Sequence, residues 1–278
     1  MSNTLDIDKL KLTDIVWPGT HNSGMDKKAP NYNVIIGNWT TCQNDSFAWQ
    51  LANGARVFDI RLGYTEKHDQ SIFYFHHNGY QSHRVLEELI TAVSTFLDQN
   101  PNEFIVFDFH QLGDGEKPFD YKKLSDLLID KLRQRIISPA DATLTVGQLK
   151  QASAQRRVVL AAPAVRALDD NYFWPRIWHK WSGKHFTDTD DLKKHISSTL
   201  QSVPSDTGLW SLSATSYGFL GGPQDIRHHI NDWFHQSRDW VTRCSIISTD
   251  FFDESEIVSY CWIATSMKAV YGHSLHRT

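Results

Sequence analysis

The chain has 278 residues, of which 40% are hydrophobic and 22% charged, so it can bury a sizeable core and is not globally disordered. Its net charge of -4 argues against general nucleic-acid binding, which requires a clustered positive field. No apolar run has the length of a membrane span, and the N-terminal residues contain no apolar signal core. We therefore expect a cytoplasmic protein, or a secreted one if a signal has been removed.

The three cysteines, Cys42, Cys244 and Cys261, show no metal-ligand spacing. Three thiols cannot all pair with one another, so we expect no disulfide framework.

Short β-rich runs alternate with segments of helical period along the chain. Strands are predicted at Thr13–Trp17, Ala55–Arg61, Ser71–His76, Phe104–Phe109, Arg157–Ala161, Gly208–Ser213 and Ser245–Thr249. Helices are predicted at Ser46–Asn53, Arg84–Asp98, Tyr121–Arg135 and Ile226–Asp239. This alternation favours a parallel sheet, and no glycine-rich nucleotide motif follows the first strand. We expect an α/β fold, a distorted (β/α)8 TIM-type barrel, with residues 1–278 forming one domain.

Polar side chains lie where the predicted strands end, which is where barrel enzymes place their active sites. They are His21, Asp59, Arg61, His76, His77, Asp108, His110 and Asp250. Each one alone has a structural explanation: His21 as a turn or cap residue, Asp59 and Arg61 as an internal ion pair, Asp250 as a helix cap. Together at several strand ends, they indicate a site.

These residue types suit cleavage of a phosphodiester without a metal ion. Arginine binds phosphate bidentately and keeps its charge. One histidine can take a proton from the attacking hydroxyl while another gives a proton to the leaving oxygen. A carboxylate behind a histidine fixes its tautomer and supports the cation that forms.

Four motifs in order resemble the X-domain of phosphatidylinositol-specific phospholipase C, bacterial single-domain type. They are Pro18–Ser23, Phe58–Arg61, Phe73–His77 and Phe104–Phe109, with a weaker match running from Gly208–Ser213 to Ser248–Asp250. The resemblance implies a distorted TIM barrel. It also implies that the inositol 2-hydroxyl attacks phosphorus and expels diacylglycerol, leaving a cyclic inositol phosphate that water then opens more slowly.

The resemblance also assigns catalytic roles by position. His21 would be the general base, Arg61 would bind the phosphate, Asp59 would hold Arg61 or a neighbour, and Asp250 would orient His21. The general acid would be His77, which precedes an Asn-Gly turn where the family has His-Gly, with His76 as the alternative.

Contacts with the substrate are expected from Asn22, Asp108, His110 and Trp181. Asn22 stands where bacterial relatives usually have aspartate, and Leu160–Pro163 stands where they have a basic residue near the inositol. The aromatic residue that stacks on the inositol ring would be Trp178 or Trp181.

We expect metal independence and no cofactor. The calcium-dependent branch of the family has acidic ligands at places that hold Val57 and His110 here. Arg61 would repel a divalent cation, and its own positive charge would stabilise the phosphate as a metal ion does.

A lipid substrate implies peripheral contact with a membrane through exposed aromatic loops, for which Asn38–Trp39 and Tyr217–Gly222 are candidates. The acidic balance predicts transient binding. We also expect a monomer. Two alternatives stay open: a metal-dependent phosphodiesterase of the glycerophosphodiester or sphingomyelinase D type, and a catalytically impaired barrel that binds inositol lipid or sugar.

Overall fold

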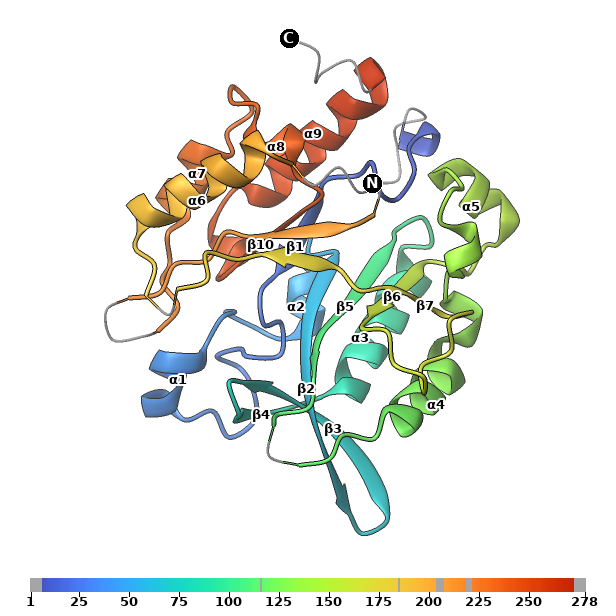
Figure 1. Cartoon of the computed structure of the whole chain (residues 1–278). Helices are drawn as coiled ribbons and strands as arrows, with labels where there is room; N and C mark the ends of the chain where they lie inside the picture. Colours follow the sequence, from blue (N-terminus) through green and yellow to red (C-terminus); the bar gives the residue numbers. More distant parts are fainter. Residues whose placement is uncertain (1–6, 116, 185, 204–207, 219–221, 273–278) are drawn as a thin grey trace.

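The computed structural model describes residues 7–115, 117–184, 186–203, 208–218 and 222–272 (Figure 1). In this part of the chain, eight parallel strands form one curled sheet in the order β7-β6-β5-β2-β1-β10-β9-β8. Their bounds are β1 (Trp17–Thr20), β2 (Val57–Lys67), β5 (Ile105–Leu112), β6 (Val158–Ala162), β7 (Phe173–Pro175), β8 (Trp178–Lys180), β9 (Trp210–Ser213) and β10 (Ile246–Thr249). The fold is therefore α/β and of the distorted TIM-barrel type, as predicted.

Helices surround the outside of the curled sheet, as Figure 1 shows. They are α1 (Val34–Thr40), α2 (Phe47–Ala52), α3 (Leu86–Gln99), α4 (Tyr121–Leu132), α5 (Val146–Ala152), α6 (Thr189–Gln201), α7 (Arg227–Trp233), α8 (Trp240–Arg243) and α9 (Ile257–Tyr271). Among the described helices, none is both long and apolar enough to cross a bilayer.

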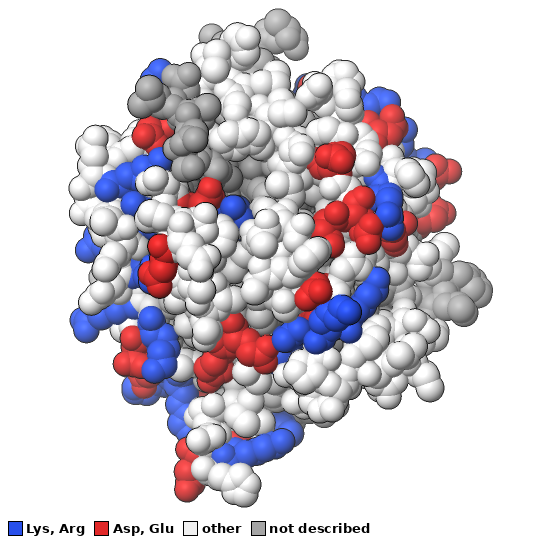
Figure 2. All heavy atoms as spheres, turned by 180° about the vertical axis from the view of Figure 1, so that it is seen from behind, with Lys and Arg blue, Asp and Glu red and all other residues white. Residues whose placement is uncertain are grey.

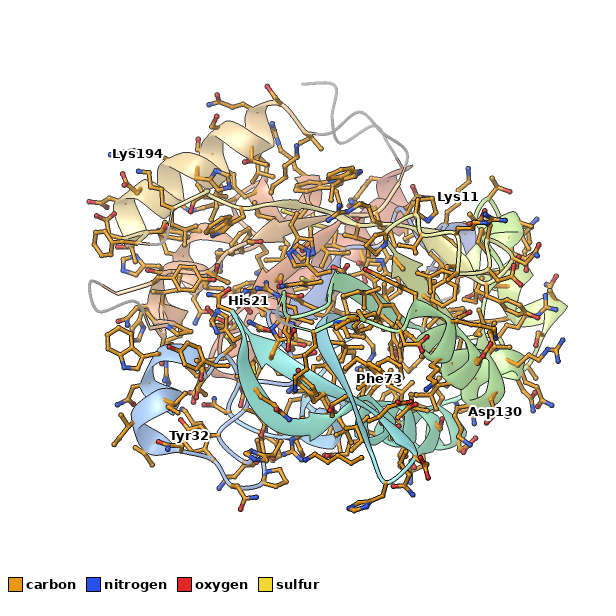
Figure 3. The ribbon with its side chains drawn as sticks, turned by 60° about the horizontal axis from the view of Figure 1, so that its bottom comes forward. Lys11, His21, Tyr32, Phe73, Asp130 and Lys194 are labelled. Carbon is orange, nitrogen blue, oxygen red and sulfur yellow. The ribbon has the colours of Figure 1, made fainter. Side chains whose placement is uncertain are left out.

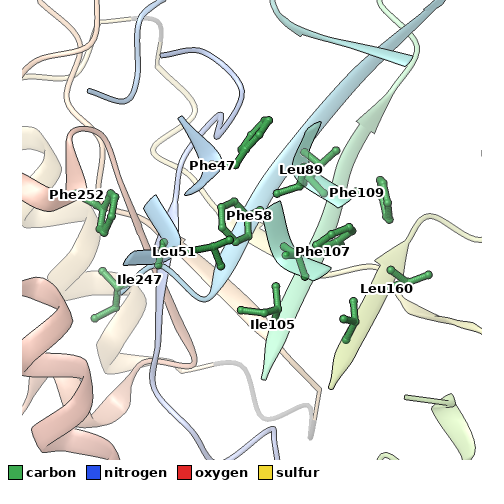
Figure 4. Close-up of a cluster of buried hydrophobic side chains, with 14 of the residues drawn as sticks. Phe47, Leu51, Phe58, Leu89, Ile105, Phe107, Phe109, Leu160, Ile247 and Phe252 are labelled. Atoms are coloured by element: carbon green, nitrogen blue, oxygen red, sulfur yellow. The ribbon is translucent and has the colours of Figure 1, made fainter. Parts of the chain in front are cut away.

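The outer face of the sheet packs on these helices through alternate residues of each strand. Phe58 and Phe107 belong to one buried cluster with Leu89 of α3 (Figure 4). Val57 and Val106 point the other way, into a second apolar cluster inside the barrel. Alternation thus leaves the inner face free for polar groups farther along the same strands, as the sequence predicted.

The predicted boundaries differ from the structure in places. The first strand begins at Trp17 instead of ending there, because the preceding residues turn and the Trp17 indole donates to the carbonyl of Leu12. The helix expected at Ile226–Asp239 ends at Trp233, because the chain turns around His235 before α8.

The strand that carries His76 and His77 is not a barrel strand. β3 (Gln70–His77) folds back antiparallel onto the long end of β2, and β4 (Tyr80–Val85) pairs with β3 in turn. The antiparallel arm made by the end of β2 with β3 and β4 extends beyond the barrel. Because β3 runs back toward the barrel, His77 lies at a cavity there. The second half of the arm, β4, and the short strands β7 and β8 were not predicted.

Candidate active site

His21 lies directly after β1, between a carboxylate and a guanidinium. Its Nδ1 is 2.7 Å from Oδ1 of Asp250, and its Nε2 is 2.9 Å from an Nη of Arg61. A carboxylate only accepts hydrogen bonds and a guanidinium only donates them. The neutral ring must therefore carry its proton on Nδ1 and offer the lone pair of Nε2, which is the tautomer that a general base needs.

Close pairing of β1 with β10 brings His21 and Asp250 together. β1 pairs with β10 so that Thr20 is opposite Thr249, and His21 and Asp250 follow immediately. At Gly19 a Cβ would lie 3.0 Å from the Ile246 side chain and 3.4 Å from the Ile247 carbonyl, so glycine allows this approach. The amide of Gln43 then donates to the carbonyls of both His21 and Thr249.

Arg61 is held by Asp59 from the same face of β2. Nε and an Nη of Arg61 lie 3.2 and 2.9 Å from the two oxygens of Asp59. Although burial opposes ionisation, the Arg61 guanidinium keeps the pKa of Asp59 well below its usual range. The backbone N–H of Asn22 also donates to this carboxylate at 3.1 Å. The arginine is thus fixed in orientation and fully charged.

His77 faces His21 across the site. The ring centroids are 6.2 Å apart and the rings are nearly perpendicular. Nδ1 of His77 lies 3.1 Å from the carbonyl of Thr40, which can only accept, so in the neutral ring this nitrogen carries the proton. Burial, then the nearby Arg61 and His21, lowers the pKa of His77 to about 3.

His76 occupies a different environment. It is buried, its Nδ1 accepts a hydrogen bond from the Gly79 N–H, and its Nε2 has no hydrogen-bond partner among the described residues. Of the two neighbouring histidines, His77 lines the cavity in front of His21 and His76 does not.

A cavity of about 480 Å³ lies in front of these groups. Its lining consists of His21, Trp39, Arg61, His77, Asn78, His110, His179, Trp181, Lys184, Ser213 and Tyr217. The labelled His21 in Figure 3 marks its position at the end of the barrel. This volume falls within the range of small-molecule sites.

The wall beside β5 carries a second imidazole–carboxylate pair. Nε2 of His179, on β8, is 2.6 Å from Oδ2 of Asp108, and the ring of His110 stacks on His179 at 3.8 Å between centroids. Burial opposes protonation of His179, but the Asp108 carboxylate raises its pKa. Burial lowers the pKa of His110 to about 3, and His179 and Arg61 add to this.

Of the four residues predicted to contact substrate, His110 and Trp181 line the cavity, whereas Asn22 and Asp108 are not among its described lining residues. Trp181 lines the cavity, whereas Trp178 does not. Asn22 is buried, with a φ of 49°, and it is not among the described lining residues. Both polar atoms of its side chain lack hydrogen-bond partners within the described part of the chain.

Sequence reasoning missed several residues at or beside the cavity, among them His179, Tyr217 and Cys42. His179 lies on a strand too short to show alternation, and no local signal points to it. Tyr217, whose hydroxyl is 3.4 Å from Nε2 of His21, was considered only as part of a loop. Cys42, whose Sγ is 3.9 Å from Nδ1 of His77, was considered only for pairing.

One group among the described residues has donor atoms close enough to hold a metal ion. These are His21, Cys42 and Asp250, with all donor atoms within 4.8 Å of one another. Their arrangement is already explained by the hydrogen bond between His21 and Asp250, and the Arg61 guanidinium lies on the other side of the same imidazole. Val57, where the resemblance implies a ligand in the calcium-dependent branch, is buried among apolar side chains.

No family model matches the sequence. Two curated relatives are named PI-PLC X domain-containing proteins: protein 1 of Danio rerio, 27% identical over 54% of this chain, and protein 2 of Mus musculus, 23% identical over 89%. The chain spans 47% of the first and 81% of the second. A variant-surface-glycoprotein phospholipase C of Trypanosoma cruzi is 32% identical over 45% of this chain and 33% of its own length.

Solved structures agree with these relatives. A phosphatidylinositol-specific phospholipase C from Staphylococcus aureus superposes with a TM-score of 0.69 at 16% identity, covering 95% of both chains. The corresponding enzyme from Listeria monocytogenes gives 0.66 at 14% identity, covering 92% of this chain and 95% of its own. These comparisons support the phosphatidylinositol-specific phospholipase C X-domain family. The four sequence motifs that resemble this family lie on β1, β2, β3 and β5 and the turns after them.

Proposed function

We propose that this X-domain protein is a metal-independent phospholipase C that cleaves phosphatidylinositol into diacylglycerol and inositol 1,2-cyclic phosphate. The observation that carries the proposal is the convergence of His21, His77 and Arg61 on one cavity. Two imidazoles and a fixed guanidinium that line one cavity are groups suited to in-line transfer at a phosphodiester.

In the first step Nε2 of His21 accepts the proton of the inositol 2-hydroxyl as that oxygen attacks phosphorus. The imidazolium that forms is supported by Asp250, which already accepts from Nδ1. Arg61 exchanges Nε2 of His21 for a phosphate oxygen as its acceptor, while Asp59 keeps the guanidinium in place. The positive charge of Arg61 then stabilises the charge on the phosphoryl oxygens.

His77 donates the proton that the leaving diacylglycerol oxygen needs. In the empty site its pKa is low because of burial, Arg61 and His21. A bound phosphodiester brings a negative charge beside the ring and offsets the charge of Arg61, so it raises the pKa of His77. The proton then resides on Nε2, and the Thr40 carbonyl continues to accept from Nδ1. The acid is thus charged only when substrate is present.

The rim of the cavity supports contact with a lipid surface. Helix α1 exposes Val34 (67%), Ile35 (77%) and Trp39 (48%), and Trp39 also lines the cavity. Apolar and aromatic side chains beside a headgroup site suit the bilayer interface, where they enter while the headgroup reaches the barrel. Of the other loop predicted for this role, Phe219–Gly221 lie outside the described residues.

The test is incubation of the protein with phosphatidylinositol vesicles, followed by phosphorus NMR. A signal of a five-membered cyclic phosphate, with diacylglycerol in the lipid extract, supports the proposal. A linear phosphate formed only after metal addition would support a metal-dependent phosphodiesterase instead. Absence of any turnover would support an impaired barrel that only binds its ligand.

A further inference from the structure

A second cavity, of about 640 Å³, lies on the side of the barrel where the strands begin. It is lined by Lys11, Thr13, Ala142, Thr143, Ala161, Trp174, Pro175, Arg176, Trp178, Lys180, Gly208, Leu209 and Trp210. None of these residues lines the catalytic cavity. The labelled Lys11 and His21 are well separated in Figure 3.

The cavity lies against an irregular part of the sheet. Strands β7 and β8 form the two edges of the sheet, yet only Arg176 and Ile177 separate them along the chain. One extended segment therefore leaves β6 and joins β9, and backbone pairing is interrupted where it crosses. On β8, His179 reaches the catalytic cavity, while Trp178 and Lys180 line the second one.

Every charged side chain in this lining is basic. Lys11, Arg176 and Lys180 contribute three positive charges, and none has an ion pair with a described residue. The Nε of Arg176 is buried and has no hydrogen-bond acceptor in the described chain. The protein as a whole has a net charge of -4, and on the face shown in Figure 2 the two signs are interspersed. Unbalanced cations around a cavity favour an anionic ligand.

The same lining provides three indole rings, from Trp174, Trp178 and Trp210. Trp178 is 61% exposed, and the Arg176 guanidinium lies over its ring at 4.6 Å from the centroid. An indole and a guanidinium held together offer a ring face for stacking beside N–H groups that can donate hydrogen bonds to a phosphate. This combination suits a flat ring that carries an anion better than it suits either part alone.

We propose that this cavity binds a phosphate carried by a planar heterocycle, the chemistry of a nucleoside phosphate. The phosphate contacts Arg176, Lys180 and Lys11, and the heterocycle stacks on the tryptophans. The site is separate from phospholipid cleavage and does not depend on the function proposed above.

Isothermal titration calorimetry of the full chain with adenosine monophosphate, adenosine and inorganic phosphate tests the proposal. Adenosine monophosphate should bind at least about tenfold more tightly than either part, since ring and anion contacts reinforce each other. Equal binding of adenosine, or no binding of the monophosphate, would overturn the proposal.

Substitutions locate the bound probe. The double change Arg176→Met with Trp178→Ala should weaken binding of adenosine monophosphate by about tenfold or more. Arg166→Met, at an exposed arginine outside both cavities, should not change it, and neither should His21→Ala. Unchanged affinity in the double variant, or loss of affinity in His21→Ala, would overturn the assignment to this cavity. Far-ultraviolet circular dichroism of each variant shows that the fold is retained.

Discussion

Arg61 donates a hydrogen bond to Nε2 of His21 at 2.9 Å, so the nitrogen assigned as base already faces a cation in the resting site. This contact is compatible only with a neutral ring protonated on Nδ1. The carboxylate of Asp250 enforces the same tautomer from the opposite side. In this arrangement the lone pair of Nε2 is held toward the cavity side of the ring, as the proposed base requires.

Asp250→Asn should reduce kcat/KM for phosphatidylinositol almost as far as His21→Ala, which should cost about 10²–10⁴-fold. An asparagine amide can donate to Nδ1 and so place the ring proton on Nε2, where it cannot act as a base. The measurement is initial rate against substrate concentration for both variants. Asp253→Asn, on the surface turn that follows, is the matched control. Near-normal rates in Asp250→Asn would contradict the tautomer argument.

Substitutions of the two adjacent histidines of β3, His76 and His77, should have different effects on catalysis. His77→Gln removes the proposed acid and should lower kcat by about 10²-fold or more. His76→Gln lies outside the cavity and should affect unfolding more than catalysis. A leaving group of low pKa, such as a nitrophenol, needs no proton and should restore much of the rate in His77→Gln. Loss of activity in His76→Gln alone, with a normal fold, would reverse the assignment.

Stability should fall as the pH is lowered below about 6.5, in part because of His110. Its pKa is about 3 in the folded protein and about 6.5 in the unfolded chain, so the unfolded state binds the extra proton between these values. Urea unfolding at pH 7.5 and pH 5 measures the loss. His110→Gln should make the loss smaller by up to about 2 kcal/mol. An unchanged difference between the two pH values would show that His110 is not buried as a neutral ring.

Activity should survive removal of divalent cations. In the proposed mechanism Arg61 supplies the positive charge at the phosphate, and Asp59 holds its guanidinium in place. Rates measured in excess chelator should match those in calcium. An activity lost in chelator and restored by calcium would refute metal independence.

Replacing apolar residues of α1 should uncouple lipid binding from chemistry. Ile35→Ser with Val34→Ser removes two exposed side chains that are absent from the catalytic lining. Binding to phosphatidylinositol vesicles, followed by sedimentation, should weaken, while cleavage of a soluble inositol phosphodiester should not change. Thr91→Ser with Thr95→Ser, on α3, serves as the control. An equal decrease in both activities would argue against a docking role.

Local patterns were sufficient for the parts of the fold with clear periodicity. Alternation in Phe58–Arg61 and Phe104–His110 predicted which residues face the helices and which face the barrel. The apolar spacing of α3 predicted that helix within two residues at its start and one at its end. These features depend on neighbours along the chain, which a single sequence reports directly.

The rest of the site depends on contacts between distant segments. His179 meets Asp108 across 71 positions, and β8 has only three residues, too few for a periodic signal. The antiparallel course of β3 follows from its pairing with the extended end of β2. No residue type in the sequence indicates this pairing. The roles of His21, His77, Arg61 and Asp250 stay predictions, although the structure places the first three around one cavity and Asp250 against His21.

The central position of β1, between β2 and β10, has a consequence for synthesis of the protein. His21 is synthesised 229 residues before its carboxylate partner. A nascent chain lacking β10 has neither the strand that completes this pairing nor Asp250. The hydrogen bond between His21 and Asp250, on which the proposed chemistry depends, can therefore form only once the intervening residues have been translated.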